Sequence, residues 1–273
     1  MASHKNAKAL FSLPYRIWHV RSVSSTNKLL SSLAKEGEQE GLVLWADKQS
    51  AGHGRFDRAF HSPRGSGVYM SILLRPAFAA NALPLLSALT AVAAAEAAEE
   101  LSGKRIGIKW VNDLYLDGHK IAGILAESGF SKNANSSLQN DLFVVIGIGI
   151  NLYTPPRMPK ALQGVAGGLW QTKREMRAAC GKKAREAFIT TFLSRFDGYI
   201  KQMPEAPFLE GYRERSVLVG RYVRIHNAAF DSAKEGAGER ALVLSINERG
   251  ALVVETEGGE RKTLEAGEVT LSL

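Results

Sequence analysis

The stretch 109–127, KWVNDLYLDGHKIAGILAE, decides the fold class of this chain. Its centre is Asp117-Gly118, a dipeptide typical of the two-residue turn of a β-hairpin. Strand candidates stand on both sides of this turn, at Asp113–Leu116 and at residues 121–127, and a further short candidate precedes them at residues 106–110. The stretch therefore predicts consecutive antiparallel strands.

Further strand candidates extend this sheet in both directions along the chain. Leu142–Asn151 reads LFVVIGIGIN and is rich in β-branched residues, which favour strands. Leu42–Ala46 and residues 68–74 are apolar runs of strand length, and residues 15–20 form a short candidate near the N-terminus. These segments predict a sheet of several strands.

Three segments carry helix signals. Residues 84–101 begin with Pro84, which a helix tolerates in its first turn. Ser25 and its polar neighbours offer capping side chains ahead of an apolar pattern, so a helix is expected to follow them. Residues 173–202 carry the longest helical pattern, and we expect one helix there despite Gly181.

The pattern changes near Ser216, where short strand candidates follow one another. Five of them are separated by turn signals, and they lie at residues 217–225, 240–247, 251–257, 260–265 and 268–273. Five short strands in such a short segment predict a small β-barrel. We therefore expect two domains, with residues 1–214 in the first and residues 215–273 in the second.

Composition excludes several classes of protein. Hydrophobic residues make up 45% of the 273 residues and charged residues 23%, which excludes collagen-like, low-complexity and acidic disordered chains. The single cysteine, Cys180, excludes a disulfide framework and a multi-cysteine zinc site. No run approaches the ~18 uncharged apolar residues of a membrane-spanning helix, and the first residues are too polar for a signal peptide. We expect a cytoplasmic protein with no membrane partner.

The net charge is +8, and part of the basic excess lies in one region. Residues 157–215 contain 12 Lys and Arg against 6 Asp and Glu. These basic residues are spread along a helical pattern and are not bunched, so they indicate a solvated helical face more than a nucleic-acid groove.

Residues 48–66 combine glycines and arginines with no apolar period, which is typical of a long loop. Glycine lets backbone N–H groups approach an anion closely, and Arg55 and Arg58 add permanent positive charge with planar donors. The same composition also fits a plain mobile surface loop. The common nucleotide signatures are absent, since there is no P-loop and Asp57 breaks the G-x-G-x-x-G pattern.

Two other segments combine groups that suit a ligand. Strand ends that bring Lys109 and Lys120 together with the carboxylate of Asp113 suit a phosphate and metal site, although a solvated lysine and a turn aspartate would look the same. Gly147 and Gly149 lie on one face of their strand and leave room for a ligand or, equally, for close sheet packing.

Taken together, these segments resemble the biotin protein ligase family. The family pattern runs S-T-N, Q-x-x-G-R-G-R-x-x-R-x-W-x-S-P, K-W-P-N-D-L, K-x-A-G-I-L-x-E and G-I-G-I-N. The chain matches it in order and spacing over about 125 residues, with Ser25-Thr26-Asn27, Gln49, Gly52-His53-Gly54-Arg55, Arg58, Ser62-Pro63, Lys109 to Leu114, Lys120 to Glu127, and Gly147 to Asn151. The resemblance implies an α+β catalytic domain, with a mixed or antiparallel sheet and helices on one side, of the class II aminoacyl-tRNA-synthetase-like type, followed by an SH3-like domain.

The chain departs from the family pattern at four positions. His53 stands where the family has its first loop arginine, Asp57 replaces a frequent glycine, Phe60 replaces a tryptophan that covers the adenylate, and Val111 replaces a proline. His53 removes a permanent charge from the ligand loop, so we expect weaker affinity for biotin or its intermediate. Arg55 remains, so we do not expect an inactive enzyme.

The resemblance implies an ATP-dependent ligase that works in two steps. Biotin is activated as biotinyl-5′-AMP with release of pyrophosphate, and a lysine of a biotin carboxyl carrier protein then receives the biotinyl group with release of AMP. The cofactors implied are ATP and Mg²⁺, and biotin is the substrate.

The resemblance also assigns roles to residues. It implies that the catalytic residues are Arg55, Lys109 and Lys120. The implied biotin-binding residues are Ser25, Thr26, Asn27, Gln49, His53, Gly54, Arg55 and Lys120. The implied nucleotide-binding residues are Arg58, Phe60, Lys109, Asn112, Asp113 and Asn151, with Asp113 also facing Mg²⁺. Trp110 and Ile148 could form apolar walls around biotin or belong to the core.

Two alternatives stay open beside this reading. A lipoate–protein ligase or octanoyltransferase would carry an R-R-x-x-G-G-G-x-V-x-H-type segment, which is absent, and Cys180 lies far from the ligand motifs. A DNA-binding biotin repressor would carry a winged helix before the S-T-N motif, but only 24 residues precede Ser25. We therefore expect a monofunctional ligase without specific DNA binding. A homodimer remains open, as does the identity of the carrier.

Overall fold

The computed structural model describes residues 14–76, 83–131, 142–155, 157–203, 205–226, 238–265 and 267–271. The N-terminal residues that argue against a signal peptide lie outside this range, and so does the end of the last strand candidate, residues 272–273. No helix in these ranges is both long enough and apolar enough to cross a membrane.

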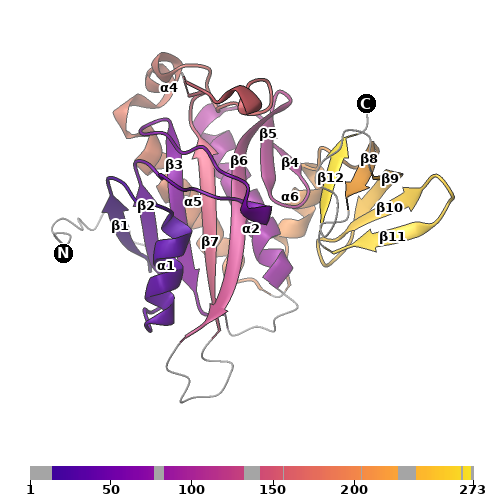
Figure 1. Cartoon of the computed structure of the whole chain (residues 1–273), viewed down its shortest axis with the longest axis horizontal. Helices are drawn as coiled ribbons and strands as arrows, with labels where there is room; N and C mark the ends of the chain where they lie inside the picture. The colour runs from indigo at the N-terminus through magenta and orange to yellow at the C-terminus, as the bar shows by residue number, and fades with distance from the viewer. Residues whose placement is uncertain are drawn as a thin grey trace.

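A seven-stranded mixed sheet forms the main body of the chain, as predicted (Figure 1). Its order is β1-β2-β3-β7-β6-β5-β4, and only β1 and β2 run parallel to each other. The strands are β1 Arg16–Val20, β2 Leu42–Ala46, β3 Gly67–Leu74, β4 Gly107–Lys109, β5 Asp113–Leu116, β6 His119–Phe130 and β7 Leu142–Asn151.

The hairpin between β5 and β6 confirms the prediction made from Asp117-Gly118. Both residues have positive φ, at 49° and 78°, as a type I′ turn requires. Farther along, β6 pairs with β7 so that Gly123 lies opposite Gly149 and Leu125 opposite Gly147. The register therefore places two of the predicted ligand segments side by side at the centre of the sheet.

Helices cover both faces of this sheet. Strand β2 alternates, with Val43 and Trp45 in the larger core cluster and Leu42 and Leu44 in the smaller one. The larger cluster contains the buried faces of α2 (Leu83–Ser102), α5 (Ala184–Ile200) and α6 (Phe208–Glu214), which form the helical layer that was predicted. The smaller cluster contains α1 (Thr26–Lys35), which covers part of the opposite face and was not expected there.

The long helix predicted over residues 173–202 is broken at Gly181. The chain forms α4 (Lys173–Cys180), a short 3₁₀ turn (Gly181–Lys183) and then α5. Gly181 has φ of 71°, a conformation that glycine adopts without strain and that ends a helix. The prediction of one continuous helix was therefore wrong.

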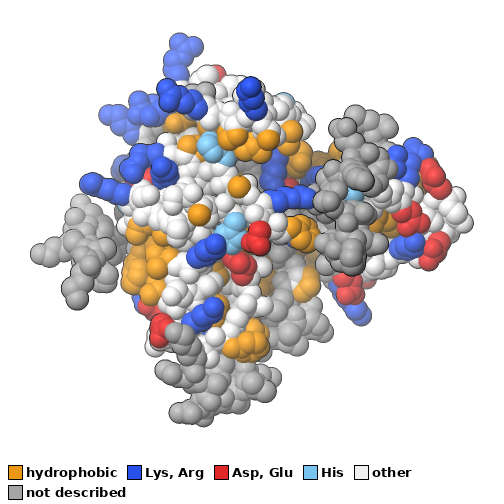
Figure 2. All heavy atoms as spheres, in the orientation of Figure 1, with side chains coloured by type: hydrophobic (Ala, Val, Ile, Leu, Met, Phe, Trp, Pro, Cys, Tyr) orange, Lys and Arg blue, Asp and Glu red, His pale blue; other side chains and the backbone are white. Residues whose placement is uncertain are grey.

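The basic residues of α4 and the following turn face solvent. Lys173, Arg174, Arg177, Lys182 and Lys183 are exposed. Figure 2 shows Lys and Arg side chains projecting around the end of the molecule that carries α4. Their exposure agrees with the solvated helical face predicted from the sequence.

Asp47, directly after β2, ties the sheet to α5. Its Oδ1 accepts from Arg185 Nη1 at 2.7 Å and lies 3.1 Å from His19 Nε2. Burial raises the pKa of Asp47, but the hydrogen bonds and positive charges of His19 and Arg185 lower it by more, so the pKa lies below its ordinary value.

The five short strands predicted near the C-terminus form a second, antiparallel sheet. They are β8 Tyr222–His226, β9 Glu239–Ile246, β10 Leu252–Thr256, β11 Arg261–Leu264 and β12 Glu268–Leu271, in the order β11-β10-β9-β8-β12. Hydrogen bonds join this part to the main body, since Trp110 Nε1 donates to Gly250 O at 2.9 Å and Arg213 Nε to Ile246 O at 2.8 Å.

Candidate active site

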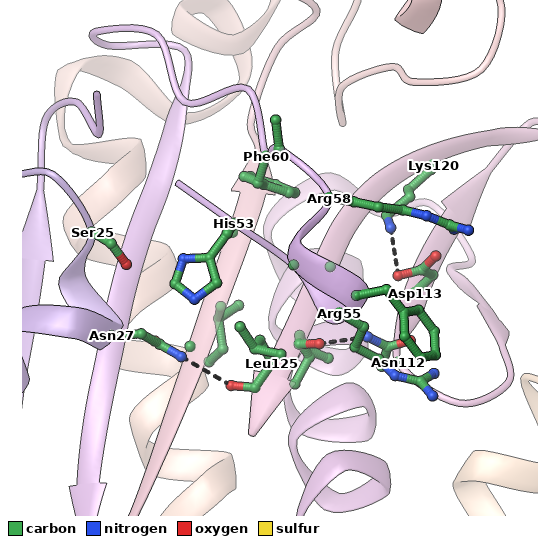
Figure 3. Close-up of a pocket in the computed structure, with 18 of the residues that line it drawn as sticks. Ser25, Asn27, His53, Arg55, Arg58, Phe60, Asn112, Asp113, Lys120 and Leu125 are labelled. Atoms are coloured by element: carbon green, nitrogen blue, oxygen red, sulfur yellow. Dashed lines mark hydrogen bonds and ion pairs between the residues drawn. The ribbon is translucent and has the colours of Figure 1, made fainter. Parts of the chain in front are cut away.

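One cavity collects the predicted ligand segments (Figure 3). It encloses about 140 Å³ and is lined from residues 25–27, 49–60, 109–113, 120–125, 147–149 and 267–269. Almost every residue predicted from the sequence lines it, namely Ser25, Thr26, Asn27, Gln49, His53, Gly54, Arg55, Arg58, Phe60, Lys109, Asn112, Asp113 and Lys120. The sheet therefore assembles motifs that are far apart along the chain.

Neutral polar groups form one end of the cavity, which we call the neutral end (Ser25, Thr26, Asn27 and Gln49). Ser25 caps α1 by accepting from Lys28 N at 3.4 Å. Gln49 Oε1 accepts from Thr26 N at 2.8 Å and from Thr26 Oγ1 at 3.1 Å. These bonds hold the start of α1 against the loop and fix the orientation of the Gln49 amide.

Asn27, a buried member of the neutral end, is held by three partners. Its Nδ2 donates to Glu127 Oε2 at 2.7 Å and to Leu125 O at 3.4 Å, and its Oδ1 accepts from Ser71 Oγ at 2.5 Å. Gly147 makes room for this side chain, because a Cβ there would lie 2.8 Å from Asn27 Cγ. Close packing, which the sequence left open, is therefore one reason for this glycine.

Three charged side chains and one amide form the opposite end, which we call the charged end (Lys109, Asn112, Asp113 and Lys120). Lys120 Nζ lies 2.6 Å from Asp113 Oδ1, and Asn112 Nδ2 donates to Ile124 O at 2.5 Å. The β5–β6 hairpin brings the two side chains together from paired strands, on which Lys120 lies opposite Tyr115 and Asp113 lies opposite Gly123. Figure 3 shows Ser25, Asn27 and His53 on one side of the cavity and Arg58, Lys120 and Asp113 on the other.

The loop at residues 48–66 folds over the cavity as a small hairpin. Phe60 N donates to Gly52 O and Gly54 N to Arg58 O, each at 2.8 Å. The turn of this hairpin contains Phe56 and Asp57 with positive φ. Aspartate tolerates that conformation better than most residues, so Asp57 can stand where the family has a frequent glycine.

Arg55 leaves the loop in the direction of the C-terminal sheet. Its Nη2 donates to Gly267 O at 2.9 Å, and Gly267 and Val269 both line the cavity. The sequence did not predict these two residues as part of the site. No local signal relates them to the loop, because the contact exists only in the folded chain.

Phe60 packs onto the glycines of the central strands. A Cβ at Gly149 would overlap the Phe60 ring, and one at Gly123 would lie 3.5 Å from Phe60 Cε2. The ring also meets Tyr69 edge to face, with centroids 6.4 Å apart. The glycines of β6 and β7 therefore leave space for an aromatic side chain from the loop.

The side chain of His53, a residue of the loop, lies on the same side of the cavity as Ser25 and Asn27 (Figure 3). Its Nε2 is 3.5 Å from Glu127 Oε1. Its Nδ1 is buried and has no hydrogen-bond partner among the described residues. The ring is thus oriented by a carboxylate on one side and leaves one polar atom for another partner.

Asn151 is the one predicted site residue that does not line the cavity. It is buried, and its Nδ2 donates to Gly167 O at 2.9 Å. Its Oδ1 has no hydrogen-bond partner within the described ranges. Trp110 and Ile148, whose role was open, line the cavity and also belong to the larger core cluster. Val111, which stands where the family pattern has a proline, is joined to Trp110 by a cis peptide bond.

Asp113 is the only acidic side chain that lines the cavity in the part of the chain that the structure describes. No group of three or more His, Cys, Asp or Glu residues able to hold a metal ion occurs in that part. The residues thus fit a Mg²⁺ ion that takes one carboxylate oxygen from the protein and other ligands from phosphates and water. They do not form a complete metal cage.

Comparison with known proteins identifies relatives along most of the chain. The bifunctional ligase/repressor BirA of Bacillus subtilis is 33% identical over 249 residues, which cover 89% of this chain and 70% of that protein. The biotin–[acetyl-CoA-carboxylase] ligase of Mycobacterium tuberculosis is 27% identical, over 92% of this chain and 86% of that protein.

Solved structures share the fold. The biotin protein ligase of Aquifex aeolicus in complex with biotin and ATP superposes with a TM-score of 0.73 at 25% identity, over 95% of this chain and 99% of that one. The profile of the Biotin/lipoate A/B protein ligase family matches residues 19–151. Those residues contain every site segment described above except residues 267–269. Together with the 33% identity to the B. subtilis protein, this match shows that the chain belongs to the biotin/lipoate A/B protein ligase family.

Proposed function

We propose that this chain is a biotin ligase that forms biotinyl-5′-AMP from biotin and ATP and transfers the biotinyl group to a lysine of a biotin carboxyl carrier protein. The observation that carries the proposal is the cavity itself, with a neutral end suited to a polar head group and a charged end suited to phosphates. Relatives named as biotin ligases, one of them solved with biotin and ATP, support this choice of substrates.

In the first step, a biotin carboxylate oxygen attacks the α-phosphorus of ATP, and the bond to the bridging oxygen of pyrophosphate breaks. A carboxylate is a weak nucleophile, and both reactants are anions. Alignment and neutralisation of charge therefore supply most of the rate. Arg55 and Lys120 hold the carboxylate and the α-phosphate, and Lys109 faces the remaining phosphates.

The charged end changes partners when the substrates bind. In the ligand-free arrangement Lys120 is paired with Asp113 at 2.6 Å. An incoming anion competes with Asp113 for Lys120 and frees the carboxylate. Asp113 would then be able to hold Mg²⁺ through one carboxylate oxygen, and the ion would neutralise phosphate charge, as is usual for sites that bind magnesium mainly through substrate phosphates.

The nucleotide contacts involve the loop and the end of β7. Arg58 and Phe60 come from the loop that covers the cavity, and Phe60 offers an aromatic face to the adenylate. Asn112 lies at the charged end. Asn151 lies outside the lining, but its Oδ1 is a buried acceptor without a partner among the described residues. A base with an exocyclic amine would satisfy that oxygen, so we propose that Asn151 contacts the nucleotide.

In the second step, the amine of the carrier lysine attacks the acyl carbon of the mixed anhydride. The bond between that carbon and the phosphate oxygen breaks, an amide forms, and AMP leaves. The amine must be uncharged to attack, so its proton is lost before or during this step.

The loop must move for this reaction to occur. The cavity of about 140 Å³ is below the roughly 300–1,000 Å³ of typical small-molecule sites. The Phe60 ring lies on the glycines of β6 and β7 inside that space. We therefore propose that residues 48–66 open to admit the substrates and close again over the adenylate.

The proposal is tested by pyrophosphate release with ATP and biotin, lipoate or octanoate in parallel. Release with biotin, followed by biotinylation of a purified carrier domain, is the expected result. Release only with lipoate or octanoate would overturn the assignment in favour of the other branch of the family. Omission of Mg²⁺ from the same assay tests the need for the ion.

The assembly and DNA predictions are tested separately. An electrophoretic shift with biotin-operator DNA is expected to give no specific complex. Sedimentation with and without biotinyl-AMP measures whether the chain forms a homodimer.

A further inference from the structure

His53 lines the cavity, and its two ring nitrogens have different surroundings. The side chain is only 12% exposed, and Nε2 lies 3.5 Å from Glu127 Oε1. Glu127 is itself held in place, because its Oε2 accepts from Asn27 Nδ2 at 2.7 Å. The carboxylate therefore has a fixed position next to one of the two ring nitrogens.

That carboxylate selects one tautomer of the neutral ring. An ionised carboxylate can only accept hydrogen bonds, so it favours a proton on the nitrogen that faces it. With the proton on Nε2, the nitrogen nearer the carboxylate, Nδ1 carries a lone pair. Since Nδ1 is buried and has no partner among the described residues, it is an acceptor that lacks a donor.

The other acceptors at the neutral end already have protein donors. Asn27 Oδ1 accepts from Ser71 Oγ, and Gln49 Oε1 accepts from two groups of Thr26. In Figure 3 the His53 ring lies on the same side of the cavity as Ser25 and Asn27, away from Lys120 and Asp113. His53 Nδ1 is buried in this structure, and the proposed opening of the loop would make it available to an N–H group of a ligand head bound at this end.

We infer that His53 Nδ1 accepts a hydrogen bond from a ligand N–H, that Glu127 positions it to do so, and that the pair makes the cavity selective for a cyclic urea. The inference rests on the proposed function, because the ureido ring of biotin supplies such N–H groups. The dithiolane of lipoate and the alkyl chain of octanoate have no N–H. Either of these would leave Nδ1 buried and unpaired, which is the effective way for a site to reject an analogue.

This role differs in kind from that of the arginine that the family pattern has at the same position. Arginine carries donors only, so it can bind a carboxylate or phosphate but cannot accept from a ureido group. At this position the chain therefore has an acceptor where the family pattern has a charge. The consequence is a change in selectivity for the head group, in addition to the weaker anion binding expected from the sequence.

The test measures binding of biotin, lipoate and octanoate to the full chain by calorimetry. His53→Phe removes both nitrogens but keeps a ring, and we expect it to weaken biotin binding about tenfold without weakening lipoate or octanoate. His19→Phe is the matched control, because His19 stacks on Trp45 with centroids 3.9 Å apart and lies outside the cavity. This control is expected to bind biotin like the wild type.

A second pair of variants keeps the inference testable if His53→Phe does not fold. The side chain of asparagine places an acceptor near the position of Nδ1, whereas that of glutamine reaches the position of Nε2. His53→Asn is therefore expected to bind biotin more tightly than His53→Gln. Equal affinities in that pair would overturn the inference.

The positioning role of Glu127 has its own readout. Nitrogen-15 spectra of the histidine rings distinguish the two tautomers, and His53 is assigned by comparison with His53→Phe. We expect Nε2–H in the wild type and a shift toward Nδ1–H in Glu127→Gln, together with weaker biotin binding. Nδ1–H in the wild type would refute the inference, as would biotin affinity that is unchanged in His53→Phe.

These outcomes separate the inference from the proposed function. If the wild type binds biotin and His53→Phe binds it equally well, the inference fails and the proposed function stands. If the wild type binds lipoate or octanoate but not biotin, both fail.

Discussion

A single methyl group added at Gly147 tests how the neutral end is built. Gly147 lies on β7 between Ser71 of β3 and Leu125 of β6. In Gly147→Ala the new Cβ would lie 2.8 Å from Asn27 Cγ and 3.0 Å from Asn27 Nδ2, which is too close. The φ of Gly147 is not in the positive range that disfavours other residues, so the substitution acts through contact alone and Asn27 must move.

The expected loss in the free energy of unfolding follows from the hydrogen bonds that Asn27 would lose. Its short hydrogen bonds go to Ser71 Oγ at 2.5 Å and to the carboxylate of Glu127 at 2.7 Å. A neutral hydrogen bond contributes about 0.5–1.5 kcal/mol and one to a charged group about 1.5–3 kcal/mol. We therefore expect the free energy of unfolding to fall by roughly 2–4 kcal/mol, and the melting temperature by about 5–15 °C for a chain of this size.

Thermal and urea unfolding measure the loss of stability, and calorimetry measures the effect of the substitution on biotin binding. Gly198→Ala is the matched control, because Gly198 lies in α5 and a Cβ there would meet nothing within 4 Å. The control should raise stability by about 0.5–1 kcal/mol, as alanine does in place of glycine within a helix. A Gly147→Ala protein that melts within ~1 °C of the wild type and binds biotin equally well would refute the reasoning.

Four other predictions concern the ends of the cavity, the loop and the sheet edge. Lys120→Ala should lower pyrophosphate release at least about a hundredfold with an unchanged melting temperature, since Lys120 is partly exposed; an unchanged rate would make its charge a surface feature. Arg55→Ala should release biotinyl-AMP about ten to a hundred times faster, measured by chase with unlabelled intermediate, and wild-type retention would contradict its role. Trypsin should cut residues 48–66 more slowly once biotin and ATP are present, whereas equal rates would argue against closure. Asp47 has a lowered pKa in the fold, so its contribution is present above the unfolded value of about 3.9 and lost as pH falls through the lower folded value. The stability advantage of the wild type over Asp47→Asn should therefore shrink below about pH 4, and a constant difference would contradict this.

The features that the sequence predicts well are those set by neighbouring residues. Asp117-Gly118 can adopt positive φ at both positions, so the β5–β6 hairpin follows from two residues. The β-branched run Leu142–Asn151 has the same bounds in the structure as in the prediction. The site was predictable for the same reason, because each motif is a short segment at a strand end or loop, and all the predicted site residues except Asn151 line the cavity.

The features that were missed depend on contacts between distant parts of the chain or on one residue's conformation. Gly181 interrupts a continuous helical pattern, and only its φ of 71° shows that α4 ends there. The short helix α6 buries Phe208, Leu209 and Tyr212, but seven residues are too few for a clear period. Gly267 and Val269 enter the cavity because the C-terminal sheet docks beside the loop, which no local pattern encodes.

The hydrogen bond from Arg55 to Gly267 joins residues that are 212 positions apart. A ribosome adds ~5–20 residues per second, so on the order of 10–40 s separate the synthesis of the loop from that of its anchor. In the later part of this interval, once Asn151 has been added, the nascent chain contains every strand of the seven-stranded sheet but cannot form the Arg55 contact. Translation that stops before Gly267 would therefore yield a protein with all the motifs of the family profile but without the hydrogen bond from Arg55 to Gly267.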